Sequence, residues 1–389
     1  MSISYSTIKV NKKDELNHTL HVPPFVVTSK SAKMVFLNAG LFEEMPTDPI
    51  CKVYDYTKGD LVGDREFLKL HPSALQYSPS GELISCGFTN GILKLIHSDN
   101  FADIQSFSYT RLCINQVMFS RNANYLASGD ASFCVALLHL QFDADGDRWI
   151  CTGKYRSHAA TVTGVHFTED SEGLTRLFSI GQDTMLVEYN VQESTVASGL
   201  KLKGQYPLNN LTPPTSISSY LTFFGELHLV ICDGGFKVRI YDTIRFVCHK
   251  TFLGPAFGTP IFHMHCIRNH LAKEYMVFAT QEQVIGIMST PNGNKKNLQM
   301  LGLVAHPGVI SSVAVSYDGK VILSISGVDR LTSLLHPCSP LSYSFSMAFA
   351  SSSSISELGF STKVSGLGLD LTVLVVFLSS HWDPFLIYT

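Results

Sequence analysis

The residues that come nearest to a known chemical pattern are a histidine, a serine and an aspartate within one short stretch. His158, Ser179 and Asp183 have the side-chain types of a serine hydrolase triad, in which the histidine takes a proton from the serine and the aspartate orients the histidine. The surrounding stretch offers neither a nucleophile elbow nor an oxyanion site, and the same three side chains can satisfy one another as buried polar groups. We therefore expect a structural hydrogen-bond network here and no catalytic residue.

A second candidate is the acidic run Asp143-Ala144-Asp145-Gly146-Asp147, which is similar to the opening of a calcium-binding loop. An EF-hand places ligands at loop positions 1, 3 and 5, a glycine at 6 and a glutamate at 12, between two helices. Counted from Asp143, Gly146 falls at position 4 and Lys154 at position 12, and strand-like runs flank the segment. We expect a solvated loop and no metal site.

A third candidate is a soft metal site at His263, His265 and Cys266. On an extended strand 263 and 265 share one face and 266 points the opposite way, so the three side chains cannot converge on one ion. The sequence also lacks a phosphate-binding glycine loop, a dinucleotide fingerprint and an HExxH zinc motif. It thus predicts no catalytic, cofactor-binding or metal-ligating residues and no cofactor.

All of these residues belong to a repeating unit, of which the stretch from His158 to Val191 is the most complete copy. Its apolar residues alternate in short runs separated by Gly, Asp and Ser turns, which is the pattern of a small antiparallel sheet. Turns that align with the one at Gly181 recur about every 40 to 50 residues, at Gly87, Gly129, Asp233, Thr280 and Gly327. Units of about four short strands at this period are typical of an all-β propeller, and we predict about seven blades.

The units resemble WD repeats. His158 stands where that family has the histidine of its Gly-His pair, Asp183 where it has its turn aspartate, and Tyr241-Asp242 where it has Trp-Asp. The segments SPSGEL at 78–83 and SYDGKV at 316–321 are similar to inner-strand turns of the family. The resemblance implies a buried hydrogen-bond network with Ser179 as its middle member.

The position of the family's tryptophan is where the sequence departs from the pattern. The residues found there in successive units are Tyr54, Ile96, Leu138, Tyr189, Tyr241, Met288 and Leu335. Such side chains can still fill the space, each contributing about 1.5 to 3 kcal/mol by burial. We expect the hydrogen bond of the indole to be lost.

Several strings resemble more narrowly the C-terminal propeller of WD-repeat proteins at the base of radial spokes in motile axonemes. They are GKYRSH at 153–158, LVEYN at 186–190, CHKTFLGPAFGTP at 248–260, and the run from His306 to Val309 followed by SYDGK. The resemblance implies a non-enzymatic interaction scaffold of the cilium or flagellum, with radial-spoke components, dynein-regulatory components and calmodulin as partners. The alternatives are a general cytoplasmic WD-repeat adaptor, in trafficking or ubiquitin ligation, and a propeller enzyme with acidic or histidine side chains gathered at the channel mouth.

The composition narrows the classes of partner and the compartment. The chain has 389 residues, 45% of them hydrophobic and 16% charged, which is a globular composition. A formal charge of -3 and a pI near 6.6 give no basic field for nucleic acid. The nine cysteines are scattered without CxxC spacing, which favours free thiols in a reducing compartment, and no secretory signal opens the chain. We expect the protein to be located in the cytoplasm, in the cytoskeleton and in the axoneme of the cilium or flagellum.

The pattern divides the chain into three parts. Residues 1–33 alternate weakly and contain Pro23 and Pro24, so we expect an N-terminal extension or the end of a preceding unit. Residues 34–335 hold the propeller, and residues 336–389 form a Ser-rich, partly hydrophobic tail. Within the tail, Val364 to Leu378 is apolar but falls short of the ~18 residues that a bilayer requires, which disfavours a membrane anchor. It either completes the last blade as a strand or belongs to a disordered tail.

Overall fold

The computed structural model consists of β-strands and the turns between them. It describes residues 3–9, 25–28, 33–38, 50–55, 60–143, 146–208, 212–222, 224–254, 260–268, 274–290, 300–306, 308–315, 322–326, 331–337, 358–365 and 370–377. The predictions made at Asp145, at Gly327 and at the 316–321 turn lie outside these ranges. Within them, no helix has the length and apolar character needed to cross a membrane.

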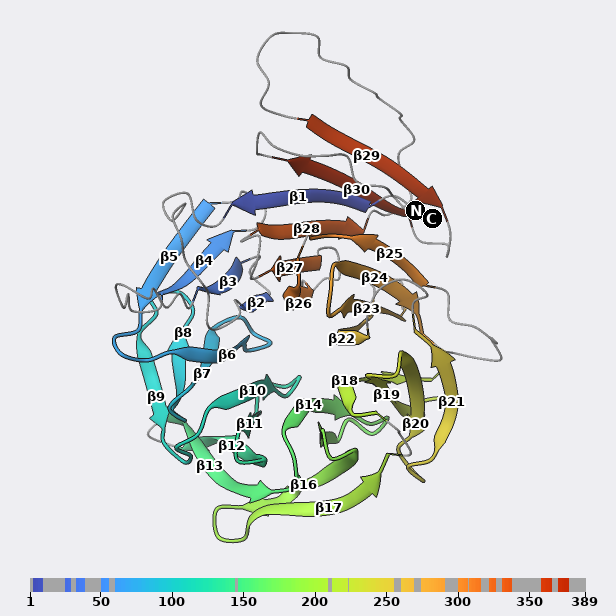
Figure 1. Cartoon of the computed structure of the whole chain (residues 1–389). Coiled ribbons are helices and arrows are strands. Elements are labelled where there is room, and N and C mark those ends of the chain that lie inside the picture. Colours follow the sequence, from blue (N-terminus) through green and yellow to red (C-terminus); the bar gives the residue numbers. More distant parts are fainter. Residues whose placement is uncertain are drawn as a thin grey trace.

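In the described ranges the strands form seven sheets, arranged as blades around a common axis (Figure 1). Six blades have four antiparallel strands each, which follow one another from the axis outward. Blades 1 to 3 contain β2 (Phe25–Thr28), β3 (Lys33–Asn38), β4 (Ile50–Asp55) and β5 (Asp60–Glu66); β6 (Pro72–Tyr77), β7 (Leu83–Phe88), β8 (Leu93–His97) and β9 (Asp103–Phe107); and β10 (Ile114–Phe119), β11 (Tyr125–Asp130), β12 (Cys134–Asp143) and β13 (Gly146–Arg156).

Blades 4 to 6 contain β14 (Val162–Glu169), β15 (Thr175–Gly181), β16 (Met185–Thr195) and β17 (Gly199–Pro207); β18 (Pro214–Leu221), β19 (Leu227–Asp233), β20 (Lys237–Asp242) and β21 (Cys248–Leu253); and β22 (Ile261–Arg268), β23 (Glu274–Thr280), β24 (Val284–Ser289) and β25 (Met300–Val304). Blade 7 contains β26 (Ile310–Val315), β27 (Ile322–Ser326) and β28 (Leu331–Pro337), joined by β1 (Ile3–Lys9), β29 (Leu358–Ser365) and β30 (Asp370–Phe377). The predicted all-β propeller is confirmed.

The hydrophobic core lies between neighbouring blades. Phe178 and Ile180 of blade 4 pack with Leu229 and Ile231 of blade 5, and an equivalent cluster joins blades 2 and 3. Because each blade is covered on both faces, its middle strands are buried almost throughout, as in β15. The alternation that marked the strands in the sequence is therefore strongest at the edges of each blade and weakest at its centre.

The ring is closed by the N-terminus of the chain. β1 pairs antiparallel with β28 along its whole length, from Ile3 opposite Pro337 to Lys9 opposite Leu331. β2 begins at Phe25, directly after Pro24, and is the inner strand of blade 1. The predicted boundary at residue 34 was therefore wrong. The two prolines precede a strand, and residues 1–33 contribute β1 to blade 7 and β2 to blade 1.

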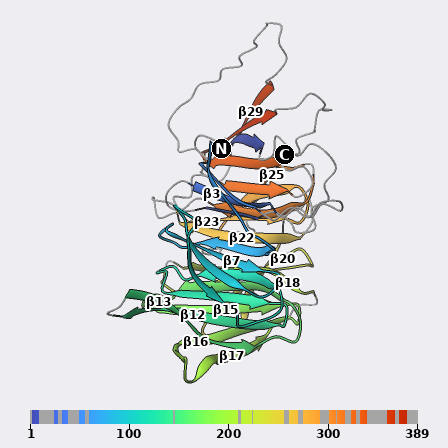
Figure 2. The same cartoon turned by 90° about the vertical axis from the view of Figure 1, so that its left-hand side faces the viewer.

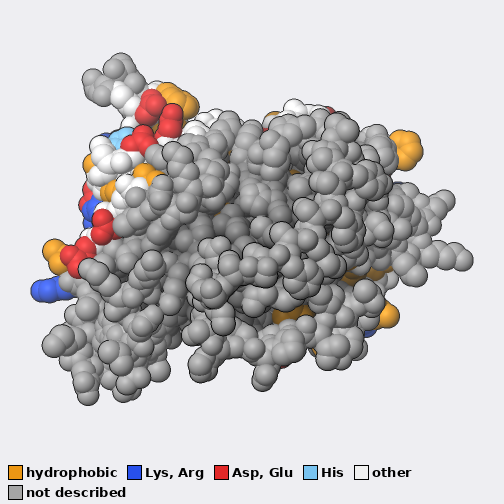
Figure 3. Space-filling model, turned by 90° about the horizontal axis from the view of Figure 1, so that it is seen from above, with side chains coloured by type: hydrophobic (Ala, Val, Ile, Leu, Met, Phe, Trp, Pro, Cys, Tyr) orange, Lys and Arg blue, Asp and Glu red, His pale blue; other side chains and the backbone are white. Residues whose placement is uncertain are grey.

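The C-terminal segments extend the sheet of blade 7. β29 and β30 form a hairpin, and β30 meets β28 where His336 lies opposite Thr372. The strand that pairs with β28 along its whole length is β1, and the apolar C-terminal run lies outside β1 (Figure 1). Of the alternatives that the sequence left open, the one in which this run completes the last blade is therefore not the arrangement found. In the view onto this side of the ring, the described side chains come into sight mainly at the left, where acidic groups lie beside basic and hydrophobic ones (Figure 3).

Candidate functional site

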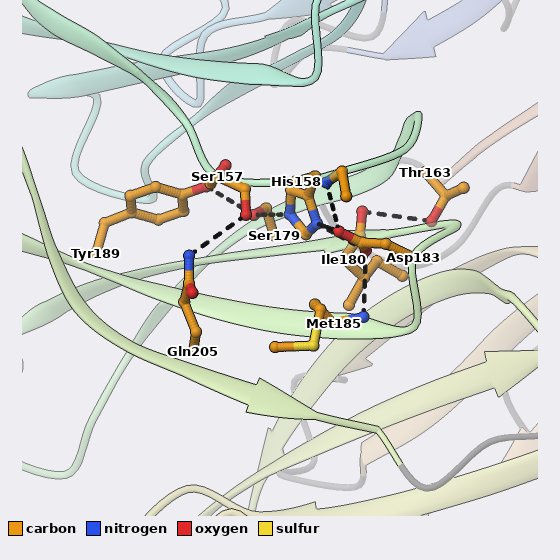
Figure 4. A network of polar contacts seen from close by, with 10 residues as sticks. Ser157, His158, Thr163, Ser179, Ile180, Asp183, Met185, Tyr189 and Gln205 are labelled. Carbon is orange, nitrogen blue, oxygen red and sulfur yellow. Dashed lines mark hydrogen bonds and ion pairs between the residues drawn. The ribbon is translucent and has the colours of Figure 1, made fainter.

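The polar residues of blade 4 meet in one continuous network (Figure 4). His158 lies just before β14, Ser179 on β15, and Asp183 in the turn that leads to β16. His158 Nδ1 donates to the Asp183 carboxylate, 3.0 Å from Oδ1, and its Nε2 lies 2.7 Å from Ser179 Oγ. The predicted set of three is therefore brought together by the loop before β14, the strand β15 and the turn that follows β15.

The network continues to Tyr189, at the family's tryptophan position, and to Ser157, which the sequence did not single out. Tyr189 Oη, from β16, lies 2.8 Å from Ser179 Oγ and donates to Ser157 Oγ at 2.6 Å. No indole stands at the family's tryptophan position in this blade, but the phenol of Tyr189 makes hydrogen bonds of its own from the same place. Burial raises the pKa of the Tyr189 hydroxyl, which keeps it protonated and able to donate. The serine directly before His158 was the signal available in the sequence.

Asp183 also fixes the backbone of its turn. Its carboxylate accepts from the backbone N–H of Ala159 at 2.8 Å and from that of Met185 at 3.2 Å. Gly181 is required where the turn begins, because a Cβ there would lie 2.5 Å from His158 Nδ1 and 2.7 Å from Asp183 Oδ1. Charge-assisted bonds of this kind are about twice as strong as neutral ones, so the aspartate holds the loop before β14 against the turn after β15.

The same three side chains are poorly placed for hydrolysis. Ser179 is fully buried, and its hydroxyl is shared between His158 and Tyr189. A nucleophilic serine must be open to its substrate, and a buried hydroxyl in a satisfied network is not. The arrangement holds a blade together.

Related polar contacts recur in other blades with fewer members. In blade 7, His306 Nε2 lies 2.8 Å from Ser324 Oγ, which repeats the contact between His158 and Ser179. In blade 3, Asp130 accepts from the backbone N–H of Ser132 at 2.8 Å, and in blade 5, Asp233 accepts from that of Gly235 at 3.0 Å. Asp130 and Asp233 end the second strands of their blades, at the position that Gly181 has in blade 4, so they bind the backbone of their turns from two residues earlier than Asp183 does.

A second polar cluster ties blade 4 to blade 5. Arg176 Nε donates to Glu188 Oε1 at 2.8 Å, and Lys203 Nζ donates to the same oxygen at 3.1 Å. Arg176 Nη1 reaches Thr243 Oγ1 on the next blade at 3.0 Å. Glu188 is buried, and its second oxygen has no hydrogen-bond partner among the residues that the structure describes. Sequence analysis missed this cluster, although a glutamate within the apolar run LVEYN was a visible signal.

The innermost strands are linked around the axis by polar side chains that reach the next blade. The contacts run from Ser73 to Ile114 O at 2.7 Å, from Gln116 to Thr163 O at 3.4 Å, from His166 to Ser219 Oγ at 2.8 Å, and from His265 to Val313 O at 3.2 Å. Ser219 donates to Thr168 Oγ1 at 2.9 Å, so His166 Nε2 is the donor to Ser219. Burial, together with the proximity of His265, lowers the pKa of His166 to about 4, and burial lowers the pKa of His265. Both imidazoles are therefore neutral near pH 7.

The remaining candidates are placed apart from these networks. Asp143 lies opposite Gly146 at the tip of the β12–β13 hairpin, with a strand on each side rather than a helix. On β22, His265 bonds to blade 7 while the backbone N–H of Cys266 donates to Ser218 Oγ of blade 5 at 3.2 Å. In the part of the chain that the structure describes, no three His, Cys, Asp or Glu side chains form a group suited to a metal ion.

Comparison with known proteins gives relatives of one name in several organisms. The chain is 31% identical over 292 residues to "Cilia- and flagella-associated protein 251" of Mus musculus, which covers 72% of this chain and 22% of that protein. It is 30% identical over 295 residues to the protein of the same name in Tetrahymena thermophila, covering 66% of this chain and 29% of the relative. For Chlamydomonas reinhardtii the identity is 26% over 272 residues, covering 59% and 33%. The chain thus spans between about a fifth and a third of the length of these relatives.

The other two comparisons add the fold alone. No family model matches the sequence. A chain of the crystal structure of the mitotic checkpoint complex superposes with a TM-score of 0.62 at 14% identity, covering 83% of this chain and 89% of that one. Identity at this level supports the propeller architecture and carries nothing about activity.

Proposed function

Since this chain belongs to the WD-repeat propeller proteins, in the family of cilia- and flagella-associated protein 251, we propose that it is a non-enzymatic interaction scaffold of the ciliary or flagellar axoneme. Its partners in this proposal are proteins of the radial-spoke base and the dynein-regulatory machinery, with calmodulin in the same assembly. The observation that carries the proposal is that relatives in mouse, orangutan, Tetrahymena and Chlamydomonas, all of the one name, match between 59% and 72% of this chain.

The geometry supports a scaffold because the polar groups we find are used to hold blades. The blade 4 network, the Arg176 cluster and the links around the axis all join strands or neighbouring blades. His166 and His265 lie on innermost strands, and their described partners are a hydroxyl and a carbonyl rather than a carboxylate. A rigid disc of this kind presents its turns and outer strands in fixed positions, which suits the assembly of several proteins.

The test is recovery of the tagged chain from ciliated cells. We expect it in isolated axonemes, and we expect affinity purification followed by mass spectrometry to recover radial-spoke proteins, dynein-regulatory proteins and calmodulin. The control is a second propeller protein of similar size and expression that is absent from axonemes. Recovery with trafficking or ubiquitin-ligase subunits alone, and absence from axonemes, would contradict the proposal and favour a general adaptor.

A further inference from the structure

Four connections of blades 4 and 5 lie on one face of the ring, and we call them the turn face. They are residues 170–174, residues 192–198, which include the end of β16, residues 222 and 224–226, and residues 243–247. They join the first to the second strand and the third to the fourth strand of each blade, so in antiparallel sheets they emerge on the same side. The two blades are in contact there: a Cβ on Gly225 would lie 3.6 Å from Ser171 Cβ, and Arg176 holds Thr243. In side view, the neighbouring β12–β13 hairpin stands out beyond the ring (Figure 2).

The turn face exposes large apolar side chains from all four turns. They are Leu174, Val196, Phe224, Ile244 and Val247. Phe224 is 92% exposed and Ile244 is 77% exposed, so neither contributes to packing within the ring. Single exposed apolar residues are common on protein surfaces, but a gathering on adjacent turns is typical of a protein-binding site.

The charges of the turn face are mostly of one sign. The four turns contain Asp170, Glu172, Glu193 and Glu226 against one basic residue, Arg245. Glu193 lies 3.5 Å from Lys201 on β17, and Glu226 lies 3.8 Å from His228, but both glutamates are more than half exposed. Exposed pairs of this kind are weak, so the carboxylates remain open to a partner of opposite charge.

We propose that the turn face binds a basic protein segment in which lysines or arginines alternate with large apolar side chains. The apolar side chains of such a segment would cover Leu174, Phe224 and Ile244, and its cations would meet the surrounding carboxylates, which gives the apolar centre and polar rim of a protein interface. The apolar hairpin β29–β30 is not the occupant, because it lies across the ring from blade 4 (Figure 1). The inference rests on the proposed scaffold function and names the chemistry of one partner.

The test uses two synthetic amphipathic peptides with the same apolar positions, one of leucine and lysine and one of leucine and glutamate. We expect the purified full chain to bind the lysine peptide at least about tenfold more tightly than the glutamate peptide, with an affinity that falls as salt rises. Phe224→Ser with Leu174→Ser, and separately Glu172→Lys with Glu226→Lys, each weaken binding by about tenfold or more. The matched controls are Leu253→Ser, which removes an exposed apolar side chain at the opposite end of β21, and Asp64→Lys on β5; both leave binding within about twofold.

Equal binding of the two peptides, or the same loss in the control variants, overturns the proposal. So does a dimer of the chain, seen by light scattering, that disappears in the Phe224→Ser and Leu174→Ser variant, because the occupant would then be a second copy. Circular dichroism and a thermal melt of each variant separate loss of binding from loss of fold. If peptide binding fails while the chain is still recovered with axonemal proteins, the inference falls and the proposed function stands.

Discussion

The hydroxyl of Tyr189 lies 2.8 Å from the hydroxyl of Ser179, and both are buried within blade 4. Through this contact the phenol joins the network that runs to His158 and Asp183. The position that the WD family gives to an indole is thus occupied by a smaller side chain, which donates to Ser157 and lies within hydrogen-bond distance of Ser179.

Removing only the hydroxyl tests that role. We expect Tyr189→Phe to lower the free energy of unfolding by about 1 to 3 kcal/mol, because Ser179 and Ser157 lose a partner while the buried ring is kept. Urea denaturation followed by fluorescence measures the change. Tyr155→Phe, at a half-exposed position on β13, is the control and should be neutral within about 0.5 kcal/mol. Equal stability of the Tyr189→Phe variant and the unmodified chain would show that the phenol only fills space.

The histidine of the network is expected to matter for stability alone. His158→Ala leaves Ser179 and Asp183 without their shared partner and should lower the free energy of unfolding by about 1 to 3 kcal/mol. The exposed His97 provides the control, since His97→Ala removes no comparable contact. A denaturation midpoint for His158→Ala that equals that of the control would contradict the network.

The ion pair between Arg176 and Glu188 yields a prediction about how blades 4 and 5 are joined. Arg176→Met leaves a buried carboxylate with only Lys203 as a cationic partner, and we expect the free energy of unfolding to fall by about 3 kcal/mol. The double variant Arg176→Met with Glu188→Leu removes both charges and should recover most of that loss. Arg121→Met is the control, because Arg121 is exposed and its ion pair with Glu169 is long, at 4.0 Å. A double variant as unstable as the single one would show that the tie to Thr243 matters more than the charge.

The neutral histidines near the axis predict the pH dependence of stability. Because the pKa of His166 in the folded chain is about 4, against an ordinary value of 6.5, the unfolded chain binds a proton that the folded chain does not between these values. Stability is therefore lost as the pH falls from about 6.5 to about 4, with a further contribution from His265, whose pKa is also lowered. Denaturation midpoints across this range should fall less steeply for His166→Gln than for the unmodified chain and for His97→Gln. An unchanged slope in His166→Gln would mean that His166 is not buried in its neutral form.

The sequence was sufficient to predict those features that depend on a few neighbouring residues. The aligned turns at Gly87, Gly129 and Gly181 fall at the ends of the second strands of successive blades, because each turn is specified by its own few residues. The pairing of His158 with Asp183 followed from the family pattern and is confirmed by their 3.0 Å contact.

The features that the sequence concealed depend on contacts across the ring. Ile3 and Pro337 lie at opposite ends of the chain, and no local pattern indicates that they pair. Weak alternation in 1–33 was interpreted as an extension because an outer strand needs little apolar character. The contact between Arg176 and Thr243 could not be predicted either. Thr243 lies on the next blade, and the orientation of one blade against the other is set by the packing between them.

The closure of the ring gives a last prediction, which compares the two ends of the chain. β1 covers the outer edge of β28 along its whole length, whereas β30 meets β28 at one residue pair. Deleting residues 1–24 removes β1 and should expose the backbone N–H and C=O groups of β28, which invite pairing with other chains. We expect a lower melting temperature and increased light scattering on heating for this variant. Deleting residues 358–389 leaves β1 in place, so the melting temperature should stay close to that of the full chain. If the C-terminal deletion were the more damaging one, the apolar hairpin would be the element that closes the ring, and β1 would be dispensable.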